Sequence, residues 1–255
     1  MRGLYAIYRK ELGHYFVSPV AYVIVGLFLF LSGFFFMLYV NVANDQEPDA
    51  PTWVLRAFLN LLALVFLFFL PMVTMGVFAE EKKRGTVELL MTSPITELQI
   101  VLGKFLASMT LYAAMLLPTA LCLVFVWMHS DPRPTFRMML GGYLGALLFG
   151  GSLLALGSFL SSLTENQIIA AAMTFAAFLL LWAIDFGTRA ASGTTGQILQ
   201  YLSVINHYDD FTRGIIDTAG VTYYLSFIVF FLFLTIRSVD SMRWRRVNAV
   251  CAIAR

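Results

Sequence analysis

Side chains that could carry out acid–base, nucleophilic or phosphate chemistry are scattered along this sequence and form no catalytic set. The histidines are His14, His129 and His207. None has the H-E-x-x-H spacing of a zinc hydrolase, and Gly103-Lys104 lacks the glycine five residues earlier that a phosphate-binding Walker A loop requires. The sequence therefore predicts a chain that is not an enzyme, holds no metal and binds no cofactor of its own.

The strongest concentration of charge is the segment 80–98, which opens with two glutamates and three cations. Thr86 can cap the start of a short helix and Pro94 ends it. The amphipathic part contains Glu88, Leu89 and Leu90. Thr96 and Gln99 have the spacing of a capping box, which predicts the start of the next helix. Because so short a helix is unstable alone in water, we expect support from the membrane surface, the chain's own tail or a docked partner.

The elements that must position these groups are membrane helices. Of the 255 residues, 60% are hydrophobic and only 13% are charged, against about 25% charged in a soluble domain. Six stretches free of charged residues and histidine are 19 to 30 residues long, and a helix crosses a bilayer with about 20 apolar residues. We expect an all-α membrane protein with six transmembrane helices. The predicted spans are about 18–41, 57–79, 97–128, 137–163, 167–186 and 219–237.

Lysine and arginine are unequally shared between the two ends of these spans. Twelve of the 17 fall on the side of both termini and five on the other, which predicts cytoplasmic termini. The loop 80–96 and the cationic tail 238–255 then lie in the cytoplasm, and 187–217 forms a long outer segment. Four polar residues of the outer segment could contact a substrate or partner, or serve local capping and ion pairing: His207, Asp209, Asp210 and Arg213.

Residues 2–16 precede any span and have the pattern of an amphipathic helix at the membrane surface. Apolar side chains cover about half of the helical wheel, and Arg9 and Lys10 lie on the other half, toward anionic headgroups. Ser18-Pro19 ends this helix, because proline disfavours helical geometry in the preceding residue. Glu11 falls on the apolar side, where it either pairs with a nearby Lys or Arg or contacts a partner protein.

Small residues recur in the fourth span at the spacing that lets helices approach closely. The pairs are Gly141-x-x-x-Gly145 and Ser158-x-x-x-Ser162. We expect them to pack within the bundle, with a hinge or a dimer contact as the alternatives.

Several motifs together resemble the type 2 ABC exporter permeases, the ABC-2 membrane family. Between residues 78 and 104 they are Gly85-Thr86-x-Glu88-x-Leu90, Ser93-Pro94 and Gly103-Lys104. Arg9-Lys10-Glu11-Leu12 is similar to the family's N-terminal interface helix. Phe16-x-Ser18-Pro19 and the stretch 205–217 resemble its gliding-motility-type branch.

The resemblance implies a half-permease that pairs with a second copy or a related permease and binds two copies of a separate ATPase, which carries ATP and Mg. It implies ATPase-coupling roles for Gly85, Thr86, Glu88, Leu89, Leu90 and Pro94 in a coupling helix, and for Arg9, Lys10 and Glu11 in the interface helix. It also implies short outer helices between spans five and six and a bacterial inner-membrane location. The net charge of +2 gives no sign of a nucleic-acid partner. A further partner implied by this branch is an auxiliary membrane protein with an external domain.

Two functions stay open at this point. The first is a permease subunit that couples ATP hydrolysis to export of a lipid-like, amphipathic or polymeric substrate. The alternative is a mechanical or signalling subunit that drives an external partner without translocation. Spans without a hydrophilic lining suit a lipid-like substrate or none. Because Glu165 and Asp185 lie at the ends of the fifth span, no mid-membrane ion site is predicted, so the energy must come from a partner.

Overall fold

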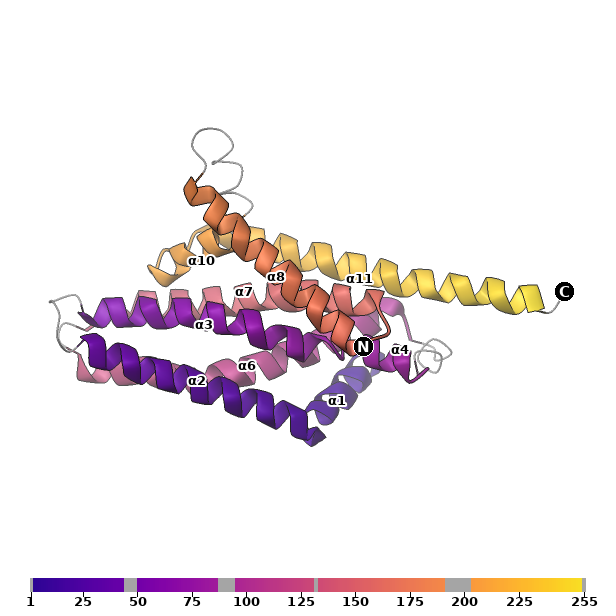
Figure 1. The fold of residues 1–255 in the computed structure, drawn as a ribbon, viewed down its shortest axis with the longest axis horizontal. Coiled ribbons are helices and arrows are strands. Elements are labelled where there is room, and N and C mark those ends of the chain that lie inside the picture. The colour runs from indigo at the N-terminus through magenta and orange to yellow at the C-terminus, as the bar shows by residue number, and fades with distance from the viewer. Residues whose placement is uncertain (1, 44–49, 87–94, 131–132, 191–202, 254–255) are drawn as a thin grey trace.

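The computed structural model describes residues 2–43, 50–86, 95–130, 133–190 and 203–253, and every regular element in these ranges is an α-helix (Figure 1). The helices are α1 (Arg2–Val17), α2 (Pro19–Ala43), α3 (Ala50–Thr74), α4 (Ala79–Lys83), α6 (Glu97–His129), α7 (Phe136–Leu163), α8 (Gln167–Ala190), α10 (Val204–Thr212) and α11 (Thr218–Ile253).

Six helical segments are long and apolar enough to cross a membrane, which confirms the predicted all-α fold and its six spans. They are α2, α3 with α4, α6, α7, α8 up to Asp185, and α11 up to Ser241. The second span starts at Ala50, seven residues before the predicted start at 57, because Pro51 is tolerated in the first turn of a helix. α11 continues helically through most of the predicted tail, to Ile253.

α3 and α7 form the centre of the bundle, and their apolar residues are mostly buried, whereas α2, α8 and α11 keep broad apolar faces exposed. α8 crosses the other helices obliquely, and α1 lies at an angle to α2 and packs against α6 (Figure 1). Both ends of the chain lie toward the end of the bundle that carries α4, and α10 lies at the opposite end. We call these the α4 end and the α10 end.

Glycines let large side chains pack directly on the backbone of α7. A Cβ atom at Gly150 would lie 2.1 Å from the ring of Tyr112, and one at Gly157 would lie 2.4 Å from the Thr74 hydroxyl. The predicted pair Gly141 and Gly145 faces α10 instead of another span, since a Cβ at Gly145 would lie 2.5 Å from Cβ of Phe211. The close-packing motif therefore holds the short helix at the α10 end.

The two serines of the second small-residue pair have different surroundings. Ser162 donates a 2.9 Å hydrogen bond to the hydroxyl of Ser238, which joins α7 to α11. Ser158 is buried, and its hydroxyl has no hydrogen-bond partner among the described residues.

The start of α6 differs from the capping box predicted there. Thr96 occupies the N-cap position with extended backbone angles, but its side chain makes no capping hydrogen bond. The side-chain oxygen of Gln99 lies against Gly3 of α1, 2.9 Å from where a Cβ atom would stand. The helix start was predicted correctly and its capping was not, because packing of α1 engages the glutamine.

Candidate functional site

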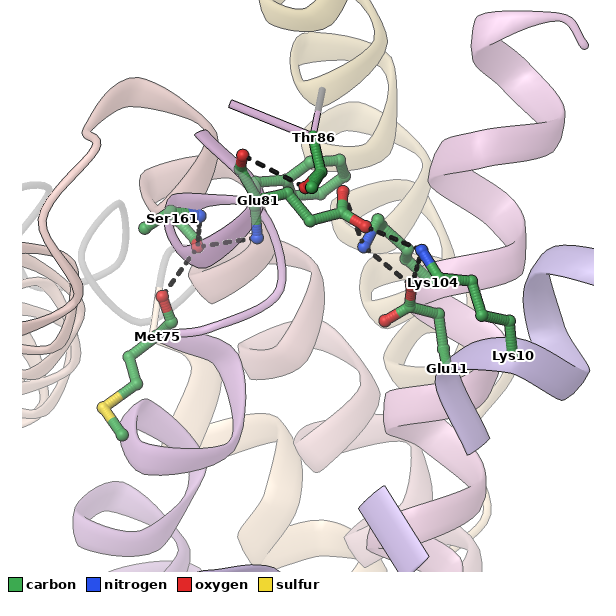
Figure 2. Close-up of polar contacts among 9 residues, drawn as sticks. Lys10, Glu11, Met75, Glu81, Thr86, Lys104 and Ser161 are labelled. Atoms are coloured by element: carbon green, nitrogen blue, oxygen red, sulfur yellow. Dashed lines mark hydrogen bonds and ion pairs between the residues drawn. The ribbon is translucent and has the colours of Figure 1, made fainter. Parts of the chain in front are cut away.

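One serine of α7 anchors the turn that leads from α3 into the short helix α4. The Ser161 hydroxyl donates to the carbonyl of Met75 at 3.0 Å and accepts from the backbone N–H groups of Phe78 and Ala79, both at 3.2 Å (Figure 2). These bonds satisfy backbone groups in the turn 75–78, where α3 ends and α4 begins. The turn and α7 therefore form one rigid unit.

α4 ends at Lys83 with Arg84 as its C-cap, and Gly85, one of the residues implied in ATPase coupling, directly follows. Gly85 has φ +69°, and its N–H donates to the carbonyl of Lys82 at 3.1 Å. The backbone N–H and hydroxyl of Thr86 both donate to the carbonyl of Glu81, at 3.1 and 3.3 Å. This pattern is the Schellman closure of a helix, which favours glycine at the left-handed position. Glu88, Leu89, Leu90 and Pro94 lie outside the described residues, as does the short helix that Thr86 was predicted to cap.

A buried lysine joins α4 to α1. Lys104 of α6 has a side chain only 2% exposed, and its ammonium lies 3.1 Å from a carboxylate oxygen of Glu11 and 3.1 Å from one of Glu81 (Figure 2). Lys10 lies 3.2 Å from Glu81 and 3.7 Å from Glu11. We call these four residues the charged junction. It contains two cations and two carboxylates, so the charges balance.

The packing of α1 on α6 brings Glu11 within reach of Lys104. A Cβ atom at Gly103 would lie 2.9 Å from a methyl group of Ile7 and 3.3 Å from the carbonyl of Leu4, so only glycine allows this approach. The hydroxyl of Tyr8 on α1 is also 3.1 Å from the hydroxyl of Thr110 on α6. Glu11 therefore pairs with a lysine, the first of the two alternatives that the sequence left open.

The electrostatics of the charged junction keep its cations and carboxylates together. A buried ammonium is stable only with opposite charges at hydrogen-bond distance, and removing one partner of such a pair costs about 3–5 kcal/mol. The Lys104 ammonium also lies 5.4 Å from the centre of the Phe78 ring, a cation–π contact. α1, α4 and the start of α6 consequently have to move together.

A second set of contacts continues from α4 to α7 and α11. The ammonium of Lys82 donates to the carbonyl of Ser162, whose hydroxyl bonds Ser238 of α11. α4 is thus connected to three membrane helices, although it is only five residues long. Arg9, the remaining residue implied in ATPase coupling, is exposed on α1 and makes no ion pair or hydrogen bond within the described part of the chain.

The four outer residues proposed from sequence come together at the α10 end. His207, Asp209, Asp210 and Arg213 all line a cavity of about 660 Å³ between α10 and the start of α11. The His207 ring stacks on Tyr223 with centroids 4.3 Å apart, and its Nδ1 is 2.9 Å from the carbonyl of Ser203. Within the described ranges no ion pair joins these four residues. Arg213 is the C-cap residue of α10, and its backbone N–H donates to the carbonyls of Asp209 and Asp210, both at 3.2 Å. Ser203 caps the start of α10, and Asp217 accepts from the backbone N–H of Ala219 at the start of α11.

Comparison with known proteins decides the family. Residues 40–239 match the family described as ABC-2 family transporter protein, which is most of the chain. The chain belongs to the ABC-2 transporter family. No curated protein matches this ABC-2 permease at a significant level.

The sequence analysis of this ABC-2 permease does not identify two residues that hold the candidate site together. Lys104 was considered only as part of a motif, although a lysine seven residues inside an apolar helix signals a nearby carboxylate. Ser161 was passed over for its neighbours Ser158 and Ser162. Nothing local identifies it, because its partners Met75, Phe78 and Ala79 are more than 80 residues away in the chain.

Proposed function

We propose that this ABC-2 permease receives force from a separate ATPase at the α4 end and couples ATP hydrolysis to export of a lipid-like, amphipathic or polymeric substrate. The charged junction carries this proposal. α1 and the loop that follows α4 are the two elements expected to contact the ATPase. Lys104 bonds Glu11 of α1 and Glu81 of α4, the helix that leads into this loop. Movement of α1 or of α4 is therefore transmitted to α6 through the buried side chain of Lys104.

The proposed transmission uses packed contacts at every step. α4 passes movement to α7 through Ser161 and Lys82, and to α11 through the Ser162–Ser238 bond. Arg9 and Lys83 are exposed on this end and make no ion pair with any described residue, so they can meet an acidic ATPase surface. Gly85 and Thr86 close α4 and set the direction in which the chain leaves it.

The remaining parts of the proposal concern assembly and orientation. The α4 end faces the cytoplasm of a bacterial inner membrane, with both termini on that side, as the lysine and arginine asymmetry predicts. The exposed apolar faces of α2 and α8 suit lipid contact and pairing with a second permease copy. Two ATPase copies then supply the ATP and Mg, and no nucleotide binds this chain. A gliding-motility-type relationship and an auxiliary external protein remain parts of this proposal.

Affinity purification of the permease from its native host in mild detergent tests the partner. We expect a stoichiometric soluble chain that carries a Walker A loop. A permease that purifies without any ATPase in several detergents would contradict the proposal.

Substitutions in the loop test the coupling itself. We expect Glu88→Lys or Leu89→Asp to abolish the ATPase activity that the permease stimulates, while membrane insertion stays intact. Arg133→Ala, an exposed change at the α10 end, is the matched control and should keep wild-type stimulation. Normal stimulation in Glu88→Lys would show that the loop is not the coupling element.

The outer cavity favours a second candidate, a mechanical subunit that drives an external partner. The side chains of Arg213 and Asp210 are exposed there and make no hydrogen bond or ion pair with a described residue, so they are available for contact from outside. Reconstitution of the complete complex into proteoliposomes separates the two functions. Export requires ATP-dependent movement of a lipid-like or amphipathic compound across the bilayer, and mechanical transmission does not.

A further inference from the structure

Two adjoining cavities lie where α1 meets α2, beside the end of α3. They measure about 480 and 290 Å³ and share Glu11, His14, Gly76, Glu80 and Arg84 in their walls. The smaller cavity continues along apolar side chains of α2 and α3, among them Val20, Ile24 and Met72. Together they make one space with a charged end and an apolar end.

The charge that this space presents to the outside is cationic. The carboxylates are largely covered and already paired: Glu11 and Glu81 are 13% and 14% exposed and bound to Lys104, and Glu80 is bound to Arg84. The cations Lys10 and Arg84 are 60% and 65% exposed. His14 is exposed as well, and its ring has no hydrogen-bond partner within the described residues.

A neutral hydrogen-bond donor completes the charged end. The phenol of Tyr15 lines the smaller cavity and makes no hydrogen bond to any described residue. Burial raises the pKa of Tyr15, and the nearby carboxylates of Glu11 and Glu80 raise it further, so the hydroxyl keeps its proton. Arg84 has donors left beyond its bond to Glu80, since a guanidinium carries five.

The apolar end leads toward the middle of the bilayer. Leu64, Phe68 and Met72 recur every four residues along α3, and each side chain is at least 42% exposed. This stripe extends about 12 Å from the cavity, at 1.5 Å per residue. It runs between α2 and α8, which both pack on α3.

We infer that a phospholipid with an anionic headgroup binds here, its phosphate facing Lys10, His14 and Arg84 and one acyl chain lying along Met72, Phe68 and Leu64. The lipid comes from the leaflet that surrounds the α4 end, because α1 is an amphipathic helix at the surface of that leaflet. Basic pockets between membrane helices bind anionic headgroups in this way. The inference goes beyond the proposed function and does not depend on ATPase coupling.

The test is a binding titration of the purified full-length permease in detergent with fluorescent phosphatidylglycerol and phosphatidylcholine. We expect saturable binding of phosphatidylglycerol at one site per chain and clearly weaker binding of phosphatidylcholine. Replacing either side chain that faces the phosphate by glutamine, His14→Gln or Arg84→Gln, should weaken phosphatidylglycerol binding about fivefold. Met72→Trp should weaken both lipids, because it fills the apolar end without changing the charge.

Matched controls and competing outcomes keep the inference falsifiable. Lys83→Gln and Arg237→Gln remove exposed cations that do not line either cavity, and phosphatidylglycerol binding should stay at the wild-type level. Equal affinity for the two lipids would overturn the inference. Competition by inorganic phosphate, with no effect of Met72→Trp, would identify a free-anion site and would also overturn it. Thermal unfolding of every variant shows whether the fold is intact.

Discussion

Both ends of the bundle are closed by a short helix packed against α7, but the two helices are held by different forces. α4 is held by buried charge, with Lys104 between Glu11 and Glu81. α10 is held by shape and neutral hydrogen bonds: Phe211 packs onto Gly145, and the Tyr208 hydroxyl donates to the carbonyl of Leu59 at 2.9 Å. At the α10 end the charged groups are exposed in the outer cavity instead.

This difference has a mechanical consequence. In the charged junction both lysines can reach both carboxylates, so α1 and α4 can shift while each charge keeps a partner. The Phe211 ring fits tightly against Gly145 and so has only one good position, because steric overlap rises steeply with displacement. The α4 end is therefore built to move as a connected unit, and α10 is built to stay where it is.

Breaking the charged junction should have the largest effect. Lys104→Met leaves two covered carboxylates without their buried cation, and we expect a loss of about 3–5 kcal/mol in the free energy of unfolding. Thermal and denaturant unfolding in detergent measure it. The triple variant Lys104→Met, Glu11→Gln and Glu81→Gln removes all three charges and should recover most of the loss. A triple variant as unstable as the single one would mean that shape, not charge, holds α4.

Displacing α10 should have the next largest effect. Gly145→Leu places side-chain atoms where Phe211 lies, and overpacking of this kind costs about 1–3 kcal/mol. Gly33→Leu is the matched control, because nothing lies within 4 Å of its Cβ position. Phe211→Ala in the Gly145→Leu background should restore part of the stability, as read by thermal unfolding. No rescue would place the clash somewhere other than at α10.

The sequence predicts well what the membrane itself imposes. A span must be a long apolar helix, so uninterrupted apolar stretches locate six of them, and proline at position 19 locates the break between α1 and α2. Small residues at four-residue spacing predict close approach. They do not say what approaches, and the partner of Gly145 is the short helix α10.

Contacts between segments far apart in the chain could not be predicted. The pairing of Glu11 with Lys104 joins two helices that two spans separate in the chain, and no local pattern links them. The capping box at Thr96 failed for the same reason, since Gln99 turned to a neighbour on α1 that the local sequence does not contain. Predictions from local sequence patterns therefore failed where α1 packs against α6. The candidate site lies at this contact.

Removing one neutral hydrogen bond of α10 should have a smaller effect. Tyr208→Phe loses the bond to Leu59, and Tyr224→Phe loses a 2.6 Å bond to Val204. We expect each to lower the free energy of unfolding by about 0.5–1.5 kcal/mol. Tyr22→Phe, an exposed tyrosine without a hydrogen bond, should leave thermal unfolding unchanged. If Tyr208→Phe lowered the free energy of unfolding by more than 3 kcal/mol, the α10 end would depend on a single polar contact as strongly as the α4 end does. The contrast between the two ends would then fail.

The smallest effect is expected for the charges of the outer cavity. Arg213 is exposed and unpaired within the described chain, so Arg213→Ala should change the free energy of unfolding by less than about 0.5 kcal/mol. Removing a cation thus barely changes the free energy of unfolding at the α10 end, whereas removing Lys104 at the α4 end lowers it strongly. If Arg213→Ala lowered stability as Lys104→Met does, charge would hold both ends and the contrast between them would fail. Unchanged stability with altered behaviour of the assembled complex would instead assign the outer cavity to contacts made from outside the chain.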